Sequence, residues 1–306
     1  MGYRGRLAPS PTGRLHLGTA RTALVAWLAA RAAKGALVLR VEDLDPPRVV
    51  AGAADAIVED LHWLGLDWDE GPDVGGSVGP YVQSARAGMY EEALNHLRAV
   101  DRVYPCTCSR KEVALTSSAP HGDLGPLYPG SCRVAPSRPG QPAALRFRMD
   151  AQAEAFVDGL HGRVTPNRGD DFVVKRADGS YAYQLAVVVD DMAMGISEVV
   201  RGDDLLTSTP WQLALYRALG AEPPRFLHVP LVLAPDGARL AKRHGAVAIA
   251  AYRAAGWTPE RLVGRLAHTL GLARADEACR PPDLIEHFDV ARLPKTPVLL
   301  DPERLV

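Results

Sequence analysis

Apolar positions in the first part of the chain follow two alternating periodicities. From Ala20 onward they recur every three or four residues, which predicts a helix that ends at Gly35 as its C-cap. The stretch "ALVLRVED" (36–43) is apolar until Glu42 and Asp43 and therefore predicts a buried parallel strand. A second helical pattern follows and stops at Gly65. Strands that alternate with helices predict an α/β fold with a doubly wound parallel sheet, whose ligands bind at the carboxyl ends of the strands.

The pattern changes after a further predicted helix over residues 86–100. Residues 105–145 are rich in Pro, Gly, Ser and Cys and have little periodicity, which indicates an inserted module. Strand character returns in "DDFVVKRADGSYAYQLAVVVDD" (170–191), with a hairpin turn expected at Asp178-Gly179. Helical periodicity resumes near Pro259. The predicted parts are 1–100 and 181–245 as the two halves of a catalytic domain, 101–180 as the inserted module, and 246–306 as a short helical segment.

Composition narrows the class of protein without naming a function. The chain has 306 residues, 47% of them hydrophobic, and a formal net charge of −1. A near-neutral chain carries no global signal for nucleic acid, so any RNA contact would need local basic patches. The sequence has neither a membrane-length apolar run nor the apolar core of a signal peptide, so we expect a cytoplasmic protein.

The stretch "RLAPSPTGRLHLGTARTAL" (6–24) is a candidate phosphate-binding turn. Its prolines fix the path of the chain, while Gly13 and Gly18 allow the backbone to approach a ligand closely. His16 and the amides at the start of the following helix are then placed to receive phosphate. The alternative is a glycine–proline loop that carries a surface histidine.

Three of the four cysteines, Cys106, Cys108 and Cys132, cluster in the inserted module. In a large cytosolic chain such clustering favours a metal over disulfides, and thiolates at this density suit a tetrahedral, structural zinc ion. The fourth ligand is either Tyr128 or His121, of which chemistry alone favours the histidine. Buried thiols without a metal are the alternative.

Two motifs carry a resemblance to a known family. "HLGT" (16–19) resembles the HIGH signature of class I aminoacyl-tRNA synthetases, and "RLAKR" (239–243) resembles their KMSKS loop. The resemblance implies a Rossmann-like catalytic domain in which a carboxylate attacks the α-phosphate of ATP, supplied with Mg²⁺. His16 and Lys242 would be the catalytic residues, although Lys242 alone would be read as a surface charge. The implied ATP-binding residues are His16, Gly18, Thr19, Arg239, Leu240, Ala241, Lys242 and Arg243, with Ala241 where serine is common.

Further stretches resemble the glutamyl branch of that family. They are "RLAPSPTG", "LRVEDLDPPR", "LGLDWDEGP", "YPCTCS", "YQLAVVVDD", "VVRGDDLL" and "HVPLVL". The resemblance implies a glutamate site formed by Arg6, Ala8, Ser10, Glu42, Tyr183 and Arg201, and it favours Tyr128 as the fourth zinc ligand. Arginines suit the carboxylates of glutamate and Glu42 suits its ammonium group. For Arg201 the alternative is a structural ion pair with Asp203 or Asp204.

The chain ends at Val306, which leaves no room for the large anticodon-binding domains of synthetases that charge tRNA with glutamate. We therefore expect a truncated, monomeric branch of the glutamyl family that activates L-glutamate without tRNA. Its acceptor would be the queuosine base in the anticodon of tRNA(Asp). The alternatives are a minimal glutamyl-tRNA synthetase that charges the 3′ end of tRNA(Glu), and an inactive RNA-binding paralogue.

Overall fold

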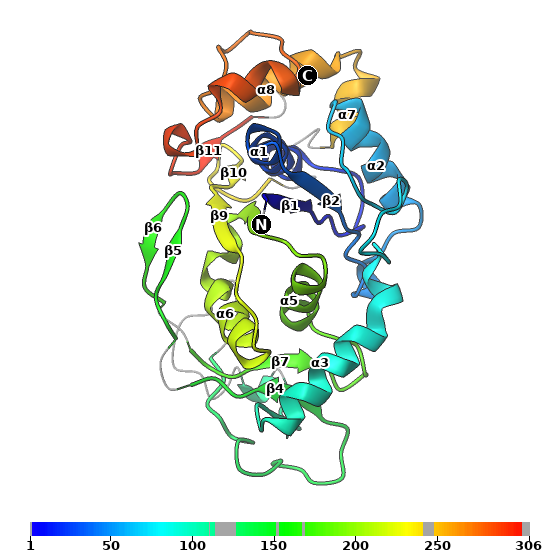
Figure 1. Ribbon diagram of the computed structural model, residues 1–306, viewed down its shortest axis with the longest axis vertical. Helices are drawn as coiled ribbons and strands as arrows, with labels where there is room; N and C mark the ends of the chain where they lie inside the picture. The colour runs from blue at the N-terminus through cyan, green and yellow to red at the C-terminus, as the bar shows by residue number, and fades with distance from the viewer. Residues whose placement is uncertain are drawn as a thin grey trace.

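The structure is a computed structural model that describes residues 2–109, 111–113, 127–150, 153–166, 169–240 and 248–301. A parallel sheet lies at its centre, with helices on both faces (Figure 1). In the described part of the chain, no helix combines the length and the apolar character needed to cross a membrane.

The central sheet is built from strands that are far apart in sequence. β1 pairs in parallel with β2, β8 pairs in parallel with β9, and β9 pairs in parallel with β5. β8 continues the sheet beside β1, because the amide of Ser197 donates to the carbonyl of Arg4 (2.8 Å). The spatial order is thus β2 (Ala36–Leu39), β1 (Arg4–Leu7), β8 (Glu198–Gly202), β9 (Arg225–Val229), β5 (Phe156–Asp158) and an antiparallel β6 (Gly162–Val164). The predicted α/β fold with a parallel sheet is confirmed.

Each face of this sheet has its own hydrophobic core. On one face the buried helix α1 packs with α8 and with residues of α2, around Leu24, Leu28 and Leu266. On the other face α5, α6 and α3 enclose a second core around Leu185 and Leu215. The helices are α1 (Leu17–Ala32), α2 (Ala53–Trp63), α3 (Ala87–Ala99), α5 (Tyr183–Ala193), α6 (Thr209–Ala218), α7 (Ile249–Ala254) and α8 (Pro259–Thr269). Short 3₁₀ helices are η1 (Pro46–Arg48), η2 (Gln83–Arg86), η3 (Asp203–Ser208), η5 (Pro281–His287) and η6 (Val290–Arg292).

The strand character expected for residues 183–191 is wrong, because this stretch forms helix α5. Every residue from Leu185 to Asp191 is buried. A helix that is enclosed on all sides has no polar face, so its sequence lacks the periodicity that marks an amphipathic helix. Its three consecutive valines then resemble a buried strand.

Gly35 does not end α1 in the way the pattern suggests. The left-handed residue is Lys34 (φ 51°), and the amide of Gly35 donates to the carbonyl of Ala30 (2.9 Å). A Cβ atom on Gly35 would instead overlap the backbone oxygen of Tyr3. The glycine is therefore required for the close approach of two chain segments. By contrast, Gly65 takes the left-handed conformation (φ 77°) directly after α2 and Leu64, as expected for a C-cap glycine.

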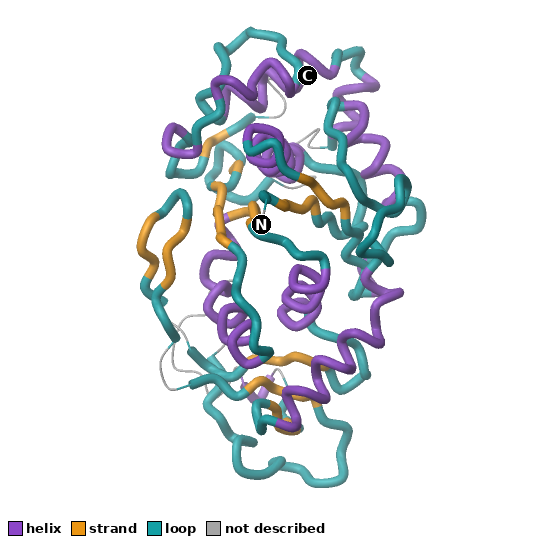
Figure 2. The backbone as a smooth tube through the Cα atoms, in the orientation of Figure 1, coloured by secondary structure: helices purple, strands orange, loops and turns teal. Residues whose placement is uncertain are grey.

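A second, antiparallel sheet lies at the end of the molecule farthest from α8. It consists of β3 (Val103–Cys106), β4 (Ala144–Phe147) and β7 (Phe172–Lys175). Figure 2 shows that the described part of the chain between β3 and β4 is mostly loop. The predicted turn at Asp178-Gly179 is confirmed, since Lys175 bridges Tyr181 across it. The division at residues 100, 180 and 245 stays a prediction, although β5 and β6 lie within 101–180 and pair with the central sheet.

The C-terminal helix begins where the sequence predicts. Thr258 caps α8 by accepting a hydrogen bond from the amide of Arg261 (3.3 Å), and Pro259 is the first helical residue. The buried Arg21 of α1 fixes this helix in place by donating to Thr269 Oγ1 (2.9 Å) and to the carbonyl of Pro230 (2.6 Å). Nearby, β10 (Val232–Leu233) pairs in parallel with β11 (Val298–Leu299).

Candidate active site

A cavity of about 650 Å³ opens at the carboxyl ends of β1 and β8. It is large enough for a nucleotide together with a small substrate. Its lining includes Arg6, Ala8, Ser10, His16, Gly18, Thr19, Glu42, Tyr183, Arg201, Arg239 and Leu240. The structure therefore brings together every described residue that the family resemblance assigns to glutamate or ATP. Ala241, Lys242 and Arg243 lie outside the described residues. The roles of all the residues assigned to glutamate or ATP stay predictions.

The start of α1 forms one wall of the cavity. His16 precedes the helix in an extended conformation (φ −98°, ψ 155°), and among the described residues no side chain caps the first helical amides. A Cβ atom on Gly18 would meet nothing within 4 Å, so the backbone here faces open space. Uncapped amides and the positive end of the helix dipole favour a negatively charged group such as phosphate.

The segment that contains Lys242 is attached beside this wall at both ends. On one side Leu240 lines the cavity, and Arg239 lies 3.5 Å from Asp204 in an ion pair. On the other side Ala248 bridges His16, and the amide of Ile249 donates to the carbonyl of Leu15 (2.9 Å). The described residues on both sides of 241–247 thus lie at the cavity.

Arg201, at the end of β8, is held by neutral partners. Its guanidinium donates to Gln212 Oε1 (2.7 Å), Thr209 Oγ1 (2.8 Å) and His228 Nε2 (3.0 Å). Among the described residues it has no carboxylate within ion-pair distance, so the expected alternative of a pair with Asp203 or Asp204 is wrong. Burial lowers the pKa of this guanidinium, and the neighbouring positive charge of Arg6 lowers it further.

Arg6 adds a second buried cation to the cavity. Its Nη1 donates to the carbonyl of Val200 (2.7 Å), and its Nε lies 3.8 Å from Asp191 without a hydrogen bond. Asp191 is thus a distant partner of Arg6 and is also paired with Arg40, while Arg201 has no carboxylate partner among the described residues. Buried guanidiniums with so little matching negative charge are costly unless a ligand supplies it. The floor of the cavity is therefore suited to an anionic ligand.

Glu42 adds a carboxylate to the same cavity, and the residues that support it were not predicted from the sequence. Arg40, which is fully buried, donates to Glu42 Oε1 (2.9 Å) and to Asp191 Oδ1 (2.8 Å). Burial raises the pKa of Glu42 while the charge of Arg40 opposes that shift. A carboxylate held in this way can bind an ammonium group.

Asp190 anchors this charged network in the second core. Its carboxylate accepts from Arg86 Nε (2.5 Å), Gln83 Nε2 (2.7 Å) and Tyr90 Oη (3.0 Å), and Arg40 Nε lies 3.7 Å away. The sequence signal for this network is the presence of charged residues at the ends of two apolar runs, "ALVLRVED" and "AVVVDD". The network can be recognised only once α5 is known to be a helix that faces β2.

The cysteine cluster lies in the second sheet and its loop. The sulfur atoms of Cys106, Cys108 and Cys132 all lie within 4.8 Å of one another. Tetrahedral zinc–thiolate sites place sulfur atoms roughly 3.8 Å apart, as follows from Zn–S bonds of about 2.3 Å, so the cluster fits a zinc ion. Burial raises the pKa of Cys132, but hydrogen bonds from Ser137 and from backbone amides outweigh this and bring it to about 5.

Tyr128 lies at the same cluster. Its Oη is 3.4 Å from Cys106 Sγ and accepts a hydrogen bond from the amide of Cys132 (2.8 Å). The guanidinium of Arg146 stacks on the Tyr128 ring at 3.7 Å. His121 lies outside the described residues. The position of Tyr128 is that expected of a fourth ligand, and the ligand itself stays a prediction.

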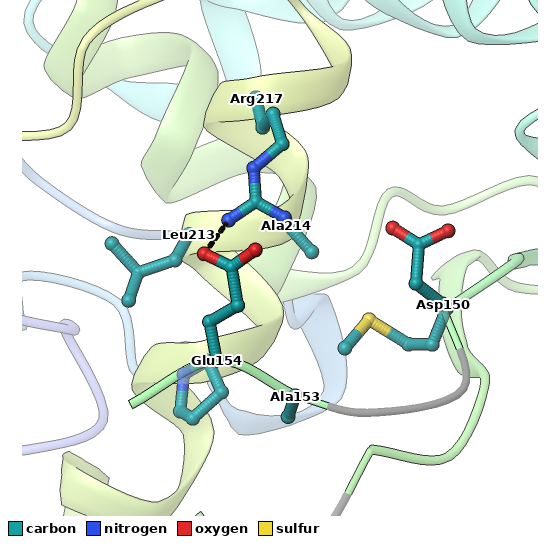
Figure 3. Close-up of a pocket in the computed structure, with 8 residues that line it drawn as sticks. Asp150, Ala153, Glu154, Leu213, Ala214 and Arg217 are labelled. Carbon is teal, nitrogen blue, oxygen red and sulfur yellow. Dashed lines mark hydrogen bonds and ion pairs between the residues drawn. The ribbon is translucent and has the colours of Figure 1, made fainter. Parts of the chain in front are cut away.

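A second hollow, between α6 and the loop after β4, is too small for a substrate (Figure 3). Its volume is about 10 Å³, which holds at most one water molecule. The ion pair between Glu154 and Arg217 lies in its wall. The large cavity is thus the better candidate for the active site.

The comparisons with known proteins agree with this geometry. The family model for "tRNA synthetases class I (E and Q), catalytic domain" matches residues 3–306. The chain therefore belongs to the class I aminoacyl-tRNA synthetase family for glutamate and glutamine, and the resemblance seen in its motifs is confirmed.

Within that family its relatives are more specific. The chain is 54% identical to the glutamyl-Q tRNA(Asp) synthetase of Symbiobacterium thermophilum, over 98% of this chain and 97% of that protein. It is 43% identical to the glutamate–tRNA ligase of Geotalea uraniireducens, over 99% of this chain and 64% of that protein. Among solved structures, it resembles a glutamate tRNA ligase from Elizabethkingia meningosepticum in complex with its amino acid. The TM-score is 0.85 and the identity 30%, with 99% of this chain and 68% of that one covered.

Proposed function

We propose that this protein activates L-glutamate with ATP and Mg²⁺, without tRNA, and transfers the glutamyl group to the queuosine base in the anticodon of tRNA(Asp). The observation that carries the first step is the pair of buried guanidiniums, Arg6 and Arg201, which line one cavity together with Glu42. Arg201 has no carboxylate partner among the described residues, and Arg6 has only the 3.8 Å contact with Asp191. Glutamate brings two carboxylates and one ammonium group, and this floor offers two cations and one anion.

In the activation step, the α-carboxylate of glutamate attacks the α-phosphate of ATP, an anhydride forms, and pyrophosphate leaves. The uncapped amides at the start of α1, together with His16, would hold the phosphates, since they form the wall beside the glutamate floor. Lys242 would neutralise the charge that develops in the transition state. Mg²⁺ would enter with ATP.

The acceptor is proposed from the relatives. The near end-to-end match at 54% identity is to a protein named for glutamyl-queuosine formation on tRNA(Asp). The 43% match to a glutamate–tRNA ligase makes charging of the 3′ end of tRNA(Glu) the second candidate. Both use the same activation chemistry, so only the acceptor distinguishes them.

Two assays test this proposal. In the first, ATP–pyrophosphate exchange is measured without tRNA for glutamate, glutamine and aspartate, and exchange is expected with glutamate alone. Glutamine should be poor because its neutral amide leaves a buried arginine unpaired. Exchange that appears only after tRNA is added would refute tRNA-independent activation, and no exchange at all would favour the inactive paralogue.

In the second assay, the acceptors are an anticodon stem–loop of tRNA(Asp) with queuosine, the same stem–loop with guanosine at that position, and full-length tRNA(Glu). Transfer to the queuosine stem–loop alone is expected. This fragment lacks the 3′ acceptor end of a tRNA, so the glutamyl group that it receives must be attached to the anticodon base. Transfer to tRNA(Glu) but to neither stem–loop would establish the second candidate.

We also propose that one structural zinc ion is bound by Cys106, Cys108, Tyr128 and Cys132, and that the protein is a monomer.

A further inference from the structure

Behind Arg201 lies a buried pair of side chains, of which only His228 lies in a family-like stretch, as the first residue of "HVPLVL". Asp158 ends β5 and His228 lies in β9, and both side chains are fully buried. Asp158 Oδ2 accepts hydrogen bonds from His228 Nδ1 (2.7 Å) and from the His228 amide (3.1 Å). Asp158 Oδ1 accepts from the amides of Leu160 and His161, both at 3.0 Å. The carboxylate is thus fixed by four hydrogen bonds.

These contacts determine which nitrogen of His228 carries the proton. The carboxylate of Asp158 can only accept, so Nδ1 carries the hydrogen. Arg201 Nε always carries a hydrogen, and it lies 3.0 Å from His228 Nε2. Nε2 must therefore be the unprotonated acceptor, and the ring is neutral.

The ring is one of three acceptors that fix the guanidinium. A guanidinium has five N–H groups. Three of them are used by His228, Thr209 and Gln212, which leaves two for other acceptors, a ligand in the cavity among them. The plane and the free edge of Arg201 are therefore set by three acceptors on two elements, His228 of β9 and Thr209 and Gln212 of α6.

We infer that Asp158 and His228 are positioning residues for glutamate: Asp158 fixes the Nδ1–H tautomer of His228, and the lone pair of Nε2 orients Arg201 toward the substrate carboxylate. This inference rests on the proposed glutamate activation. It differs from a purely structural role because it depends on the direction of one hydrogen bond and not only on filling the space.

The informative change is Asp158→Asn, which keeps the size of the side chain. If the asparagine oxygen accepts from Leu160 and His161, its amide group faces His228 Nδ1 as a donor, and the His228 amide loses its acceptor. His228 must then carry its proton on Nε2, where it opposes the N–H of Arg201. The KM for glutamate in tRNA-independent exchange should rise by roughly tenfold, as for a buried donor that loses its acceptor, while the KM for ATP stays within about twofold.

Two further variants separate orientation from packing. In His228→Gln, the amide oxygen can take the place of Nε2 and accept from Arg201, so the KM for glutamate should stay within a few-fold of that of the parent. In His228→Leu the acceptor is lost and the KM should rise as in Asp158→Asn.

Asp171→Asn is the matched control. Asp171 is also buried and accepts four hydrogen bonds, from Tyr104, from Arg133 (two) and from the Met149 amide, but it lies in the second sheet region away from the cavity. This variant should lower thermal stability without changing the KM for glutamate.

The tautomer is read directly from the ¹⁵N shifts of the histidine rings, with the His228 signals assigned by their loss in His228→Gln. The parent should show a protonated Nδ1 and an unprotonated Nε2, and Asp158→Asn the reverse. An active parent whose glutamate KM is unchanged by Asp158→Asn, or a parent with a protonated Nε2, would overturn the inference. A parent that shows no glutamate-dependent exchange but the expected tautomer would refute the proposed function instead.

Discussion

The neutral, buried state of His228 predicts a specific loss of stability in mild acid. Burial lowers the pKa of His228 from 6.5 to about 4, although Asp158 partly opposes this shift. Between these two values the unfolded chain binds a proton that the folded chain does not. Folding stability contributed by the neutral ring is therefore complete above pH 6.5 and decreases as the pH falls toward 4.

The size of the effect follows from the two pKa values. At pH 5 the unfolded histidine is almost fully protonated and the folded one is almost fully neutral, which costs about 2 kcal/mol of unfolding free energy relative to pH 7.5. For an m-value of about 3 kcal/mol/M, the urea midpoint should fall by roughly 0.7 M from this residue alone.

The assay is urea unfolding at pH 7.5 and pH 5 for the parent, His228→Gln and His287→Gln. Other groups also titrate in this range, so the informative quantity is the difference between variants. His228→Gln should lose about 2 kcal/mol less than the parent on acidification, because glutamine does not titrate. His287 is exposed, and its variant should follow the parent. Equal losses in the parent and in His228→Gln would refute the claim that His228 is buried in its neutral form.

Three further predictions concern catalysis, the metal and the fold. Lys242→Ala should slow ATP–pyrophosphate exchange at saturating glutamate by orders of magnitude at an unchanged melting temperature, and exchange at the parental rate would make Lys242 a surface charge. In Cys106→Ser, metal analysis should show the loss of one zinc ion per chain, and RNA transfer should fall more than glutamate activation. If zinc is retained in Tyr128→Phe but lost in His121→Ala, the histidine is the fourth ligand. Gly35→Ala should lower the unfolding free energy by about 1–3 kcal/mol in urea, because the added methyl group overlaps the backbone before β1, and an unchanged midpoint would mean that this overlap is relieved without cost.

The sequence predicts those parts of the fold whose pattern is local. α2 and α8 have one apolar face each and identifiable ends, at Gly65 and at Thr258 with Pro259, so their positions follow from periodicity and capping. α5 is missed for a physical reason: residues 185–191 are all buried, and the apolar run over 185–189 has no period that separates a helix from a strand.

The candidate site likewise contains residues that the sequence predicts and residues that it does not. Residues next to motifs, such as His16 and Glu42, are found because the motif itself is local. Asp158 and His228 are 70 positions apart and meet only because β5 pairs with β9, which no local pattern indicates. In the sequence, Arg40 lies within an apolar strand and nothing indicates its partners. Its ion pair with Asp191 can be recognised only once α5 places Asp191 beside it.

The charged network around Arg40 couples the candidate site to the protein interior. Glu42 lines the cavity on one side and, through Arg40, is joined to Asp190 and Asp191 in the core on the other. Replacing Glu42 to admit a different amino acid would leave a buried arginine with one fewer partner, and breaking such a pair typically costs about 3–5 kcal/mol. A substitution at Glu42 is therefore expected to change folding stability together with the chemistry of the cavity.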